Sequence, residues 1–218
     1  MEKTLRILLS SLLLGTVFCG AFSGCASINR SEPIAGIPLP SDRMKQIREL
    51  GANAAKVPAS EKPKYAQTLA TVYREESDSL IRREAVLAIA NYPCEAMRQT
   101  LRDAAKDSDR DVRQAVCKAW KVSKDEESVP ELVAILSNES DIDVRLDAID
   151  ALGELKNPAA VPALAAPLSE QNPALQHYTV MALQKITGSK ATNPEEWLAY
   201  CQGQSDVPKD GSFALFRK

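Results

Sequence analysis

Histidine and aromatic residues are scarce in this chain of 218 residues, which has one histidine, His177, and an aromatic share of 5%. A catalytic site needs convergent polar groups, such as a nucleophile with its base, paired carboxylates or a metal cluster. The sequence contains no GxSxG or HExxH motif, no Gly-rich loop before a helix and no second histidine. We therefore expect a protein that is not an enzyme and that uses no cofactor, metal or small-molecule substrate.

A strong charge of one sign is also absent, since the formal net charge is −2. Such a chain has no long-range field that would draw it to nucleic acid. A basic stripe is missing as well: Arg98 and Arg102 supply two charges, but Glu131, Ala134 and Ala163 stand at related positions further along. We expect no nucleic-acid partner.

Beyond the N-terminal segment, paired cysteines are lacking. The cysteines there are Cys94, Cys117 and Cys201, an odd number without a CxxC motif. This pattern indicates neither a disulfide framework nor a zinc site. Cys117 and Cys201 occupy apolar columns and are expected to pack as small hydrophobic residues. Cys94, in a predicted turn beside Pro93, leaves a regulatory thiol open as an alternative.

The N-terminal 24 residues have the pattern of a secretory signal peptide. Lys3 and Arg6 precede the apolar run ILLSSLLLGTVFCGAF, and small residues follow it. The stretch FSGC, residues 22–25, resembles the bacterial lipobox, although Phe22 stands where that motif usually has Leu. The resemblance implies cleavage before Cys25 and acylation of this cysteine, as in palmitate-bearing lipoproteins. The alternative is ordinary secretion with Cys25 as a free or paired thiol.

Several acyl chains anchor a protein stably, whereas a single chain holds it only marginally. The resemblance therefore implies a protein held at the membrane through Cys25 and located outside the cytoplasm, in the bacterial cell envelope. Ala26 follows the cysteine where Asp would signal inner-membrane retention, so analogy favours the outer membrane. Residues 25–40 contain Pro33, Pro38 and Pro40 without a helical period, which predicts a semi-extended tether. Ser41 is the candidate N-cap of the first helix.

One phrase recurs four times beyond the tether, with starts 31 or 32 residues apart: DSLIRREAVLAIA from Asp78, DRDVRQAVCKAWK from Asp109, DIDVRLDAIDALG from Asp141 and NPALQHYTVMALQ from Asn172. The first position always holds a good N-cap residue, whose side-chain oxygen accepts a free amide hydrogen of the first helical turn. Pro173 follows the last of them and is tolerated at the first helical position. Each phrase therefore predicts a helix.

Five columns of the aligned phrases form one wide apolar stripe. From the first column to the last they are Ile81, Val112, Val144 and Leu175; Ala85, Val116, Ala148 and Thr179; Val86, Cys117, Ile149 and Val180; Ala88, Ala119, Ala151 and Ala182; and Ile89, Trp120, Leu152 and Leu183. The column made only of alanine predicts a place where backbones of neighbouring helices approach closely.

A second predicted helix follows each phrase. VPELVAIL from Val129 and VPALAAPL from Val161 correspond, with Pro130 and Pro162 expected at the first helical position, and AMRQTLRDAA is their counterpart in the preceding repeat. We expect a repeat array over residues 41–190 that begins with a divergent repeat at 41–76 and continues with repeats starting near 78, 109, 141 and 172. A capping helix and tail over residues 191–218 complete it.

Units of just over 30 residues with D-x-x-V-R-x-x-A-x-x-A-L and V-P-x-L resemble HEAT repeats, in particular the short HEAT-like type first described in phycobilisome lyases. The resemblance implies an all-α fold, an armadillo-like α-solenoid (α-α superhelix) of stacked antiparallel helix pairs. Members of this family are mostly scaffolds that bind other proteins. A lyase-like enzyme is a weaker alternative, because an extracytoplasmic address argues against it.

Arginine recurs directly after the first apolar column, at Arg82, Arg113 and Arg145. One interpretation is an anion-binding ladder. The favoured interpretation is structural, with each arginine bridging to acidic groups at a neighbouring helix start, such as Asp109 and Asp141. We therefore assign these residues to no site, and Cys25 is the one modified residue expected.

The sequence favours a membrane-anchored scaffold that binds an envelope protein whose identity it does not reveal. The alternative is a passive structural lipoprotein without a specific ligand. The two differ in one surface property, because a binding module exposes a patch of apolar or aromatic residues and a passive spacer does not.

Overall fold

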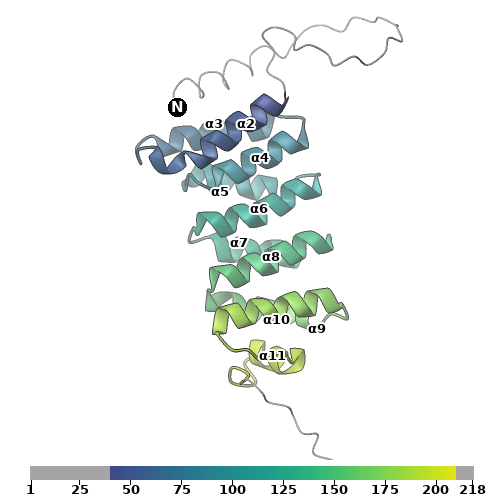
Figure 1. Cartoon of the computed structure of the whole chain (residues 1–218). Helices are drawn as coiled ribbons and strands as arrows, with labels where there is room; N and C mark the ends of the chain where they lie inside the picture. The colour runs from purple at the N-terminus through teal and green to yellow at the C-terminus, as the bar shows by residue number, and fades with distance from the viewer. Residues whose placement is uncertain (1–39, 210–218) are drawn as a thin grey trace, which may run out of the picture. The chain divides into compact units, whose positions relative to one another are not determined.

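The computed structural model describes residues 40–209, which contain ten α-helices, two short 3₁₀ helices and no strand (Figure 1). The elements are α2 (Pro40–Ala52), η1 (Ala54–Lys56), α3 (Lys62–Glu75), α4 (Ser79–Ile89), α5 (Glu95–Ala104), α6 (Arg110–Ser123), α7 (Ser128–Asn138), α8 (Ile142–Leu155), η2 (Pro158–Leu164), α9 (Ala165–Ser169), α10 (Pro173–Thr187) and α11 (Pro194–Cys201). The predicted signal peptide, Cys25 and most of the tether lie outside the described residues.

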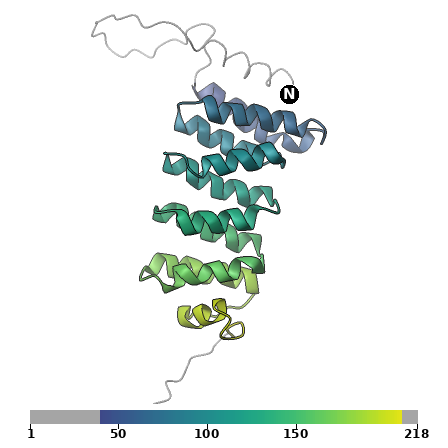
Figure 2. The same ribbon diagram turned by 180° about the vertical axis from the view of Figure 1, so that it is seen from behind.

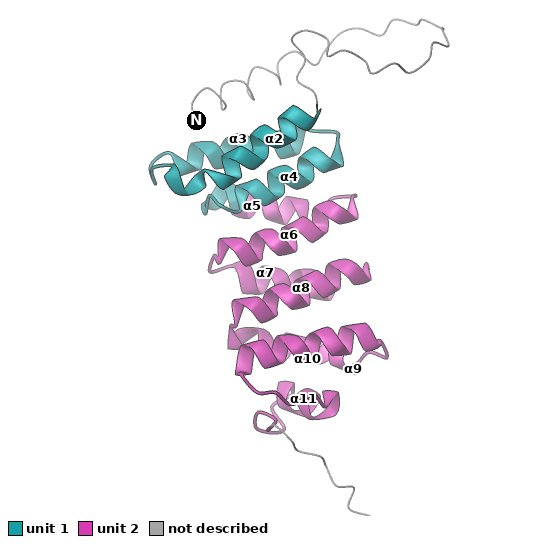
Figure 3. Cartoon of the chain, viewed as in Figure 1, with its two compact units in different colours: residues 1–97 teal, residues 98–218 magenta. Residues whose placement is uncertain are grey.

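The chain divides into two compact units, residues 1–97 and 98–218, and the division falls within α5 (Figure 3). In the first unit, α2 and α3 both pack against α4. In the second unit, α6, α8 and α10 stack in one layer, and the elements α7, η2 and α9 form the layer behind them (Figures 1 and 2). Helix α11 packs against α9 and α10 at the end of this stack.

The predicted helix starts are confirmed where the repeated phrases begin. The Asp109 and Asp141 side chains each accept two backbone amides of the following turn, Asp78 accepts one, and Asn172 accepts two. The predicted start at Ser41 is wrong, because α2 already begins at Pro40 and Ser41 lies within its first turn.

The prolines of the second helices lie elsewhere than predicted. Pro130 is the third residue of α7, not the first, and Pro162 lies inside the 3₁₀ helix η2, which begins at Pro158. Proline lacks the amide hydrogen that an α-helix interior needs and its ring crowds the preceding turn. With Pro167 also present, the expected second helix becomes a 3₁₀ turn followed by α9, which has 5 residues.

All twenty residues of the five aligned apolar columns are buried, which confirms the register drawn from the sequence. The alanine column lies where backbones approach. A Cβ added at Gly153 of α8 would stand 2.8 Å from the Cα of Ala182 in α10, and one added at Gly51 of α2 would stand 3.1 Å from the Cα of Ala88 in α4. Alanine and glycine therefore face each other at these two helix crossings.

The end of the array is closed by a small satellite core. Trp197 of α11 is fully buried, and its indole nitrogen donates a hydrogen bond of 2.9 Å to the carbonyl oxygen of Ala191. Cys201, one turn later on the same face, is also buried. Within residues 40–209, none of the helices combines the length and the hydropathy that crossing a bilayer requires.

We expect Gly153→Ala to lower the free energy of unfolding by about 1–3 kcal/mol, because the added methyl group overpacks the crossing with Ala182. Gly51→Ala, with its longer approach to Ala88, should cost less, and the gain in helix propensity of about 1 kcal/mol offsets part of that cost. Urea unfolding followed by circular dichroism measures both. Equal stability of Gly153→Ala and the parent protein would contradict the close approach.

Candidate protein-interaction surface

The arginine column holds the turns between repeats together. Arg113 Nε donates to Glu139 Oε2 at 2.7 Å, and its Nη1 donates to the carbonyl oxygen of Asp107 at 2.9 Å. Arg145 makes the equivalent ion pair one repeat later, where its Nη1 donates to Glu170 Oε2 at 2.9 Å. Arg82 Nη1 donates to the carbonyl oxygen of Ser77 at 2.8 Å.

The carboxylate partners differ from those expected. Glu139 and Glu170 each stand two residues before a helix cap, whereas Asp109 and Asp141 are occupied by the amides of their own helices. Burial disfavours the charge on Glu139, but the hydrogen bond and charge of Arg113, together with hydrogen bonds from the backbone amides of Asp141 and Ser140, outweigh this effect and lower its pKa. Because these arginines face carboxylates or backbone carbonyls within the fold, the arrangement is that of a structural ladder.

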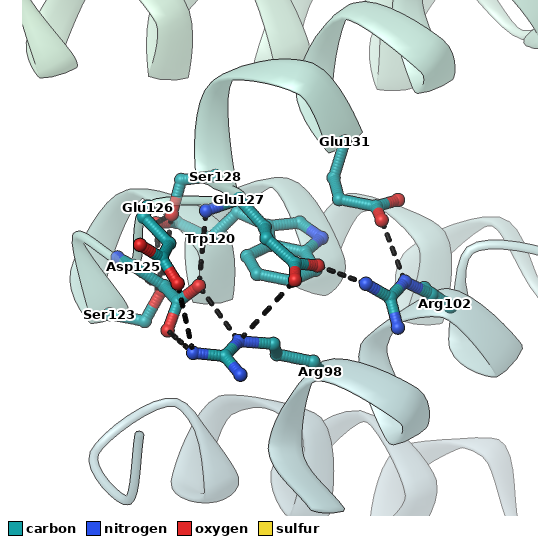
Figure 4. Close-up of polar contacts among 9 residues, drawn as sticks. All are labelled: Arg98, Arg102, Trp120, Ser123, Asp125, Glu126, Glu127, Ser128 and Glu131. Atoms are coloured by element: carbon teal, nitrogen blue, oxygen red, sulfur yellow. Dashed lines mark hydrogen bonds and ion pairs between the residues drawn. The ribbon is translucent and has the colours of Figure 1, made fainter. Parts of the chain in front are cut away.

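A second arginine cluster binds the connection between α6 and α7 to α5 (Figure 4). Arg98 Nε and Nη2 donate to the two carboxylate oxygens of Asp125 at 3.0 and 3.2 Å. Arg102 contacts Glu127 and donates through Nε to Glu131 at 2.7 Å. From the sequence, Arg98 and Arg102 were considered only as basic charges. Their spacing of four residues and the acidic run at 125–127 are the pattern that predicts these ion pairs.

A shallow groove of about 350 Å³ lies between the end of α5 and α7. Its apolar lining consists of Ala105, Ala134 and Ile135, and its rim carries Arg102, Lys106, Glu131 and Glu139. Both rim carboxylates already accept hydrogen bonds from arginines of the fold. The groove therefore presents a small apolar floor within a largely neutralised rim.

The outer faces of α6, α8 and α10 are linked by ion pairs that join each helix to the next. They are Arg110–Asp143 at 3.0 Å, Lys118–Asp147 at 3.6 Å, Lys121–Asp150 at 3.0 Å, Lys185–Asp150 at 2.8 Å and Lys185–Glu154 at 2.8 Å. Exposed pairs of this kind contribute little each. Together they mark the surface of α6 and α8 as polar and internally paired.

This polar surface is interrupted at α10. Counted from the helix caps Asp141 and Asn172, Tyr178 and Met181 of α10 occupy the positions that the ion-paired Asp147 and Asp150 hold in α8. These two side chains are 43% and 41% exposed, although both are large and apolar. They lie one turn apart, and the exposed His177 ring packs edge-on against Tyr178 at 6.0 Å between ring centroids. We call His177, Tyr178 and Met181 the α10 patch.

Other large hydrophobic side chains exposed in residues 40–209 do not form a second pair within one helix. They are Leu80 in α4, Val122 in α6, Ile142 in α8 and Val207 after α11. Single exposed apolar residues are normal on a protein surface, whereas adjacent ones mark a contact surface. The α10 patch is thus the apolar feature that distinguishes the last repeat from its neighbours.

The remaining candidate residues are the cysteines Cys94, Cys117 and Cys201, and all three are free thiols. Burial raises the pKa of the Cys117 thiol to about 12 and that of Cys201 to about 11, as fits packed side chains. Cys94 is half-buried and unbridged. Among the described residues, no three His, Cys, Asp or Glu side chains are grouped in a way that could hold a metal ion.

The family comparison adds the identity of the repeat. A model of HEAT repeats matches residues 66–145 and 129–194, which together make up more than half of the chain. The chain belongs to the HEAT-repeat family. Its fold is an all-α solenoid, and a HEAT array of this kind is a helical-repeat scaffold for protein interaction. The match is to the repeat itself, so the lyase type and the lipoprotein character stay predictions.

No curated protein matches the chain. Among solved structures, the crystal structure of an engineered protein is similar, with 18% sequence identity and a TM-score of 0.46. The alignment covers 93% of this HEAT-repeat chain and 86% of that one.

Asp147 and Asp150, one turn apart on α8, have pKa values shifted in opposite directions. Burial raises the pKa of Asp147 above its usual 3.8, and Lys118 at 3.6 Å is too distant for a strong hydrogen bond. Burial also disfavours the charge on Asp150, but hydrogen bonds from Lys185 and Lys121 outweigh it, so its pKa lies below 3.8.

These shifts predict opposite effects of two matched substitutions. The ionised form of Asp150 stabilises the fold above the unfolded pKa of 3.8, and this contribution is lost as the pH falls through the lowered folded value. Asp147 contributes stability at low pH that is lost as the pH rises through its raised pKa. At neutral pH, Asp150→Asn should cost about 0.5–1 kcal/mol, while Asp147→Asn should cost nothing or stabilise. Urea unfolding at neutral and acidic pH tests the pair, and a larger loss for Asp147→Asn would contradict it.

Proposed function

We propose that this protein is a lipid-anchored scaffold of the bacterial cell envelope and that its HEAT array docks another envelope protein through the α10 patch. The observation that carries the proposal is the replacement of paired charges by exposed Tyr178 and Met181 at α10. Tyrosine and methionine are enriched at protein interfaces, and methionine adapts its shape to a partner. A passive spacer gains nothing from exposing them.

The size of the patch defines what the partner must cover. Full burial of one large apolar side chain contributes about 1.5–3 kcal/mol, and a specific interface usually buries about 800 Å² on each side. Two side chains are too few for that area. The partner therefore extends over the ion-paired faces of α8 and α6, which supply the polar rim that surrounds an apolar interface centre.

Support for the envelope location comes from the sequence. The signal-like residues 1–24, Cys25 within FSGC and the proline-containing tether at 25–40 fit a domain held outside the cytoplasm by a lipid. Ala26 favours the outer membrane by analogy. The proposal assigns no enzymatic step, cofactor or nucleic acid to the chain, and a passive structural role is its main alternative.

Affinity capture tests the docking role. The full chain carries a tag inserted after Asn29, in the predicted tether, and is captured from detergent-solubilised native envelope. We expect one stoichiometric partner, and we expect its recovery to fall at least about tenfold when both patch residues are changed (Tyr178→Ser with Met181→Ser), as for loss of interface hot spots. Leu80→Ser is the control, because Leu80 is 47% exposed on α4 and belongs to none of the faces of α6, α8 and α10 that the partner is proposed to cover.

Two results would contradict the proposal. Undiminished capture by the doubly substituted protein would show that the partner binds another face. Absence of any stoichiometric partner, with the parent protein shown to be folded by circular dichroism, would favour the passive role.

Metabolic labelling with a palmitate analogue tests the anchor. We expect the parent protein to take up the label and to sediment with membranes, because acylation of Cys25 joins several chains to its N-terminus. Cys25→Ser should lose the label completely, whereas Cys94→Ser should keep it. Labelling that survives Cys25→Ser would contradict the predicted lipid site.

A further inference from the structure

We propose that the C-terminal residues 210–218, DGSFALFRK, cover the α10 patch of the same chain when no partner is bound. A partner that docks on the patch, as in the proposed function, must then displace this segment. The inference stands on three features: where the described chain ends, how far the last residues reach, and what side chains they carry.

The described chain ends beside the C-terminal end of α10. Gly188 caps this helix, and the hydroxyl of the next residue, Ser189, donates a hydrogen bond of 2.5 Å to the carbonyl oxygen of Pro208. Pro208 is buried. Residues 210–218 therefore start next to the helix that carries the patch.

The distances fit the reach of the segment. An α-helix rises 1.5 Å per residue, so Met181 and Tyr178 lie about 9 and 14 Å along the axis from Thr187, the last residue of α10. An extended chain spans at most about 3.3 Å per residue, so Phe213 and Phe216 can lie up to about 13 and 23 Å from Lys209. Both phenylalanines can reach the patch.

The side chains of the segment complement the patch. The four phenylalanines of the whole chain are Phe18, Phe22, Phe213 and Phe216, so none lies among residues 40–209. Two of them, with Leu215 between, stand at the chain's end. Aromatic rings pack favourably on tyrosine and on the methionine sulfur. Phe213 and Phe216 therefore bury apolar surface on Tyr178 and Met181 that water otherwise contacts.

The charges of the segment suit an exposed carboxylate of α8. Asp150 pairs with both Lys121 and Lys185, and Lys185 also pairs with Glu154. Glu154 keeps 45% of its side chain exposed. Arg217 and Lys218, which follow Phe216, can pair with this carboxylate, an effect of the size of an exposed ion pair.

Photo-crosslinking in the purified full chain, tagged after Asn29 and free of partner, tests the inference. Tyr178 is replaced by p-benzoylphenylalanine, which keeps an aromatic ring at the patch. After irradiation and trypsin digestion, we expect an adduct between the peptides 157–185 and 210–217, in protein that migrates as a monomer. The same photoreactive residue in place of Val122 serves as the control and should give no adduct with 210–217.

The adduct should depend on the phenylalanines and less strongly on the charges. Phe213→Ser with Phe216→Ser should lower its yield at least about tenfold, as expected for loss of two buried rings. Arg217→Gln with Lys218→Gln should lower it about twofold, which is the size of an exposed ion-pair effect. A yield unaffected by the phenylalanine substitutions would overturn the proposal.

Three further outcomes would overturn it. An adduct found solely in dimers would show that the segment covers the patch of a second copy. Equal adducts from positions 178 and 122 would show contact without preference for the patch. No adduct with 210–217 from position 178 would show that the patch stays open.

Failure of this inference is distinguishable from failure of the proposed docking function, because the crosslink is measured without a partner. If both hold, Phe213→Ser with Phe216→Ser should increase partner capture, since the partner no longer displaces the segment. If the segment covers the patch but no partner exists, the adduct forms and capture stays empty.

Discussion

Close approach of neighbouring helices at alanine and glycine is the constraint on which the rest of the structure depends. Ala182 of α10 lies against Gly153 of α8, and Ala88 of α4 lies against Gly51 of α2. Larger residues at these crossings would separate the helices and shift every side chain along them. With the crossing of α8 and α10 fixed, the register between these two helices is fixed too, and it brings Lys185 to Asp150 and Glu154.

The regular stack explains why function is to be sought where the pattern breaks. Buried columns and capped helix starts recur in each repeat. They therefore stabilise the scaffold and do not indicate where a ligand binds. Surface ion pairs add little stability each and leave few charges of α6 and α8 available to a partner. At α10 the same positions carry Tyr178 and Met181, and the surface there favours contact with an apolar partner.

The helix starts and the apolar columns were predictable because both depend on local or periodic rules. The arginine partners were not, because Asp141 is already used by amides of α8, which leaves Arg113 to the preceding Glu139. Nor was the replacement of a second helix by η2 and α9, where Pro162 stands inside the turn instead of starting a helix. Prediction of the α10 patch requires a comparison of outward-facing positions between repeats. Which positions correspond is known only once the register between the helices is known. The anchor at Cys25 and the envelope location stay predictions.

Native-state hydrogen exchange of the full chain tests most directly whether stacking through the small-residue crossings holds the array together. Helix α8 packs between α6 and α10, whereas α11 closes the end of the stack. If neighbouring repeats stabilise one another, amides of α8 should exchange slowest in residues 98–209 and those of α11 markedly faster, as in repeat proteins whose stability is a sum of nearest-neighbour interfaces. Equal exchange rates in α8 and α11 would contradict this account of the array.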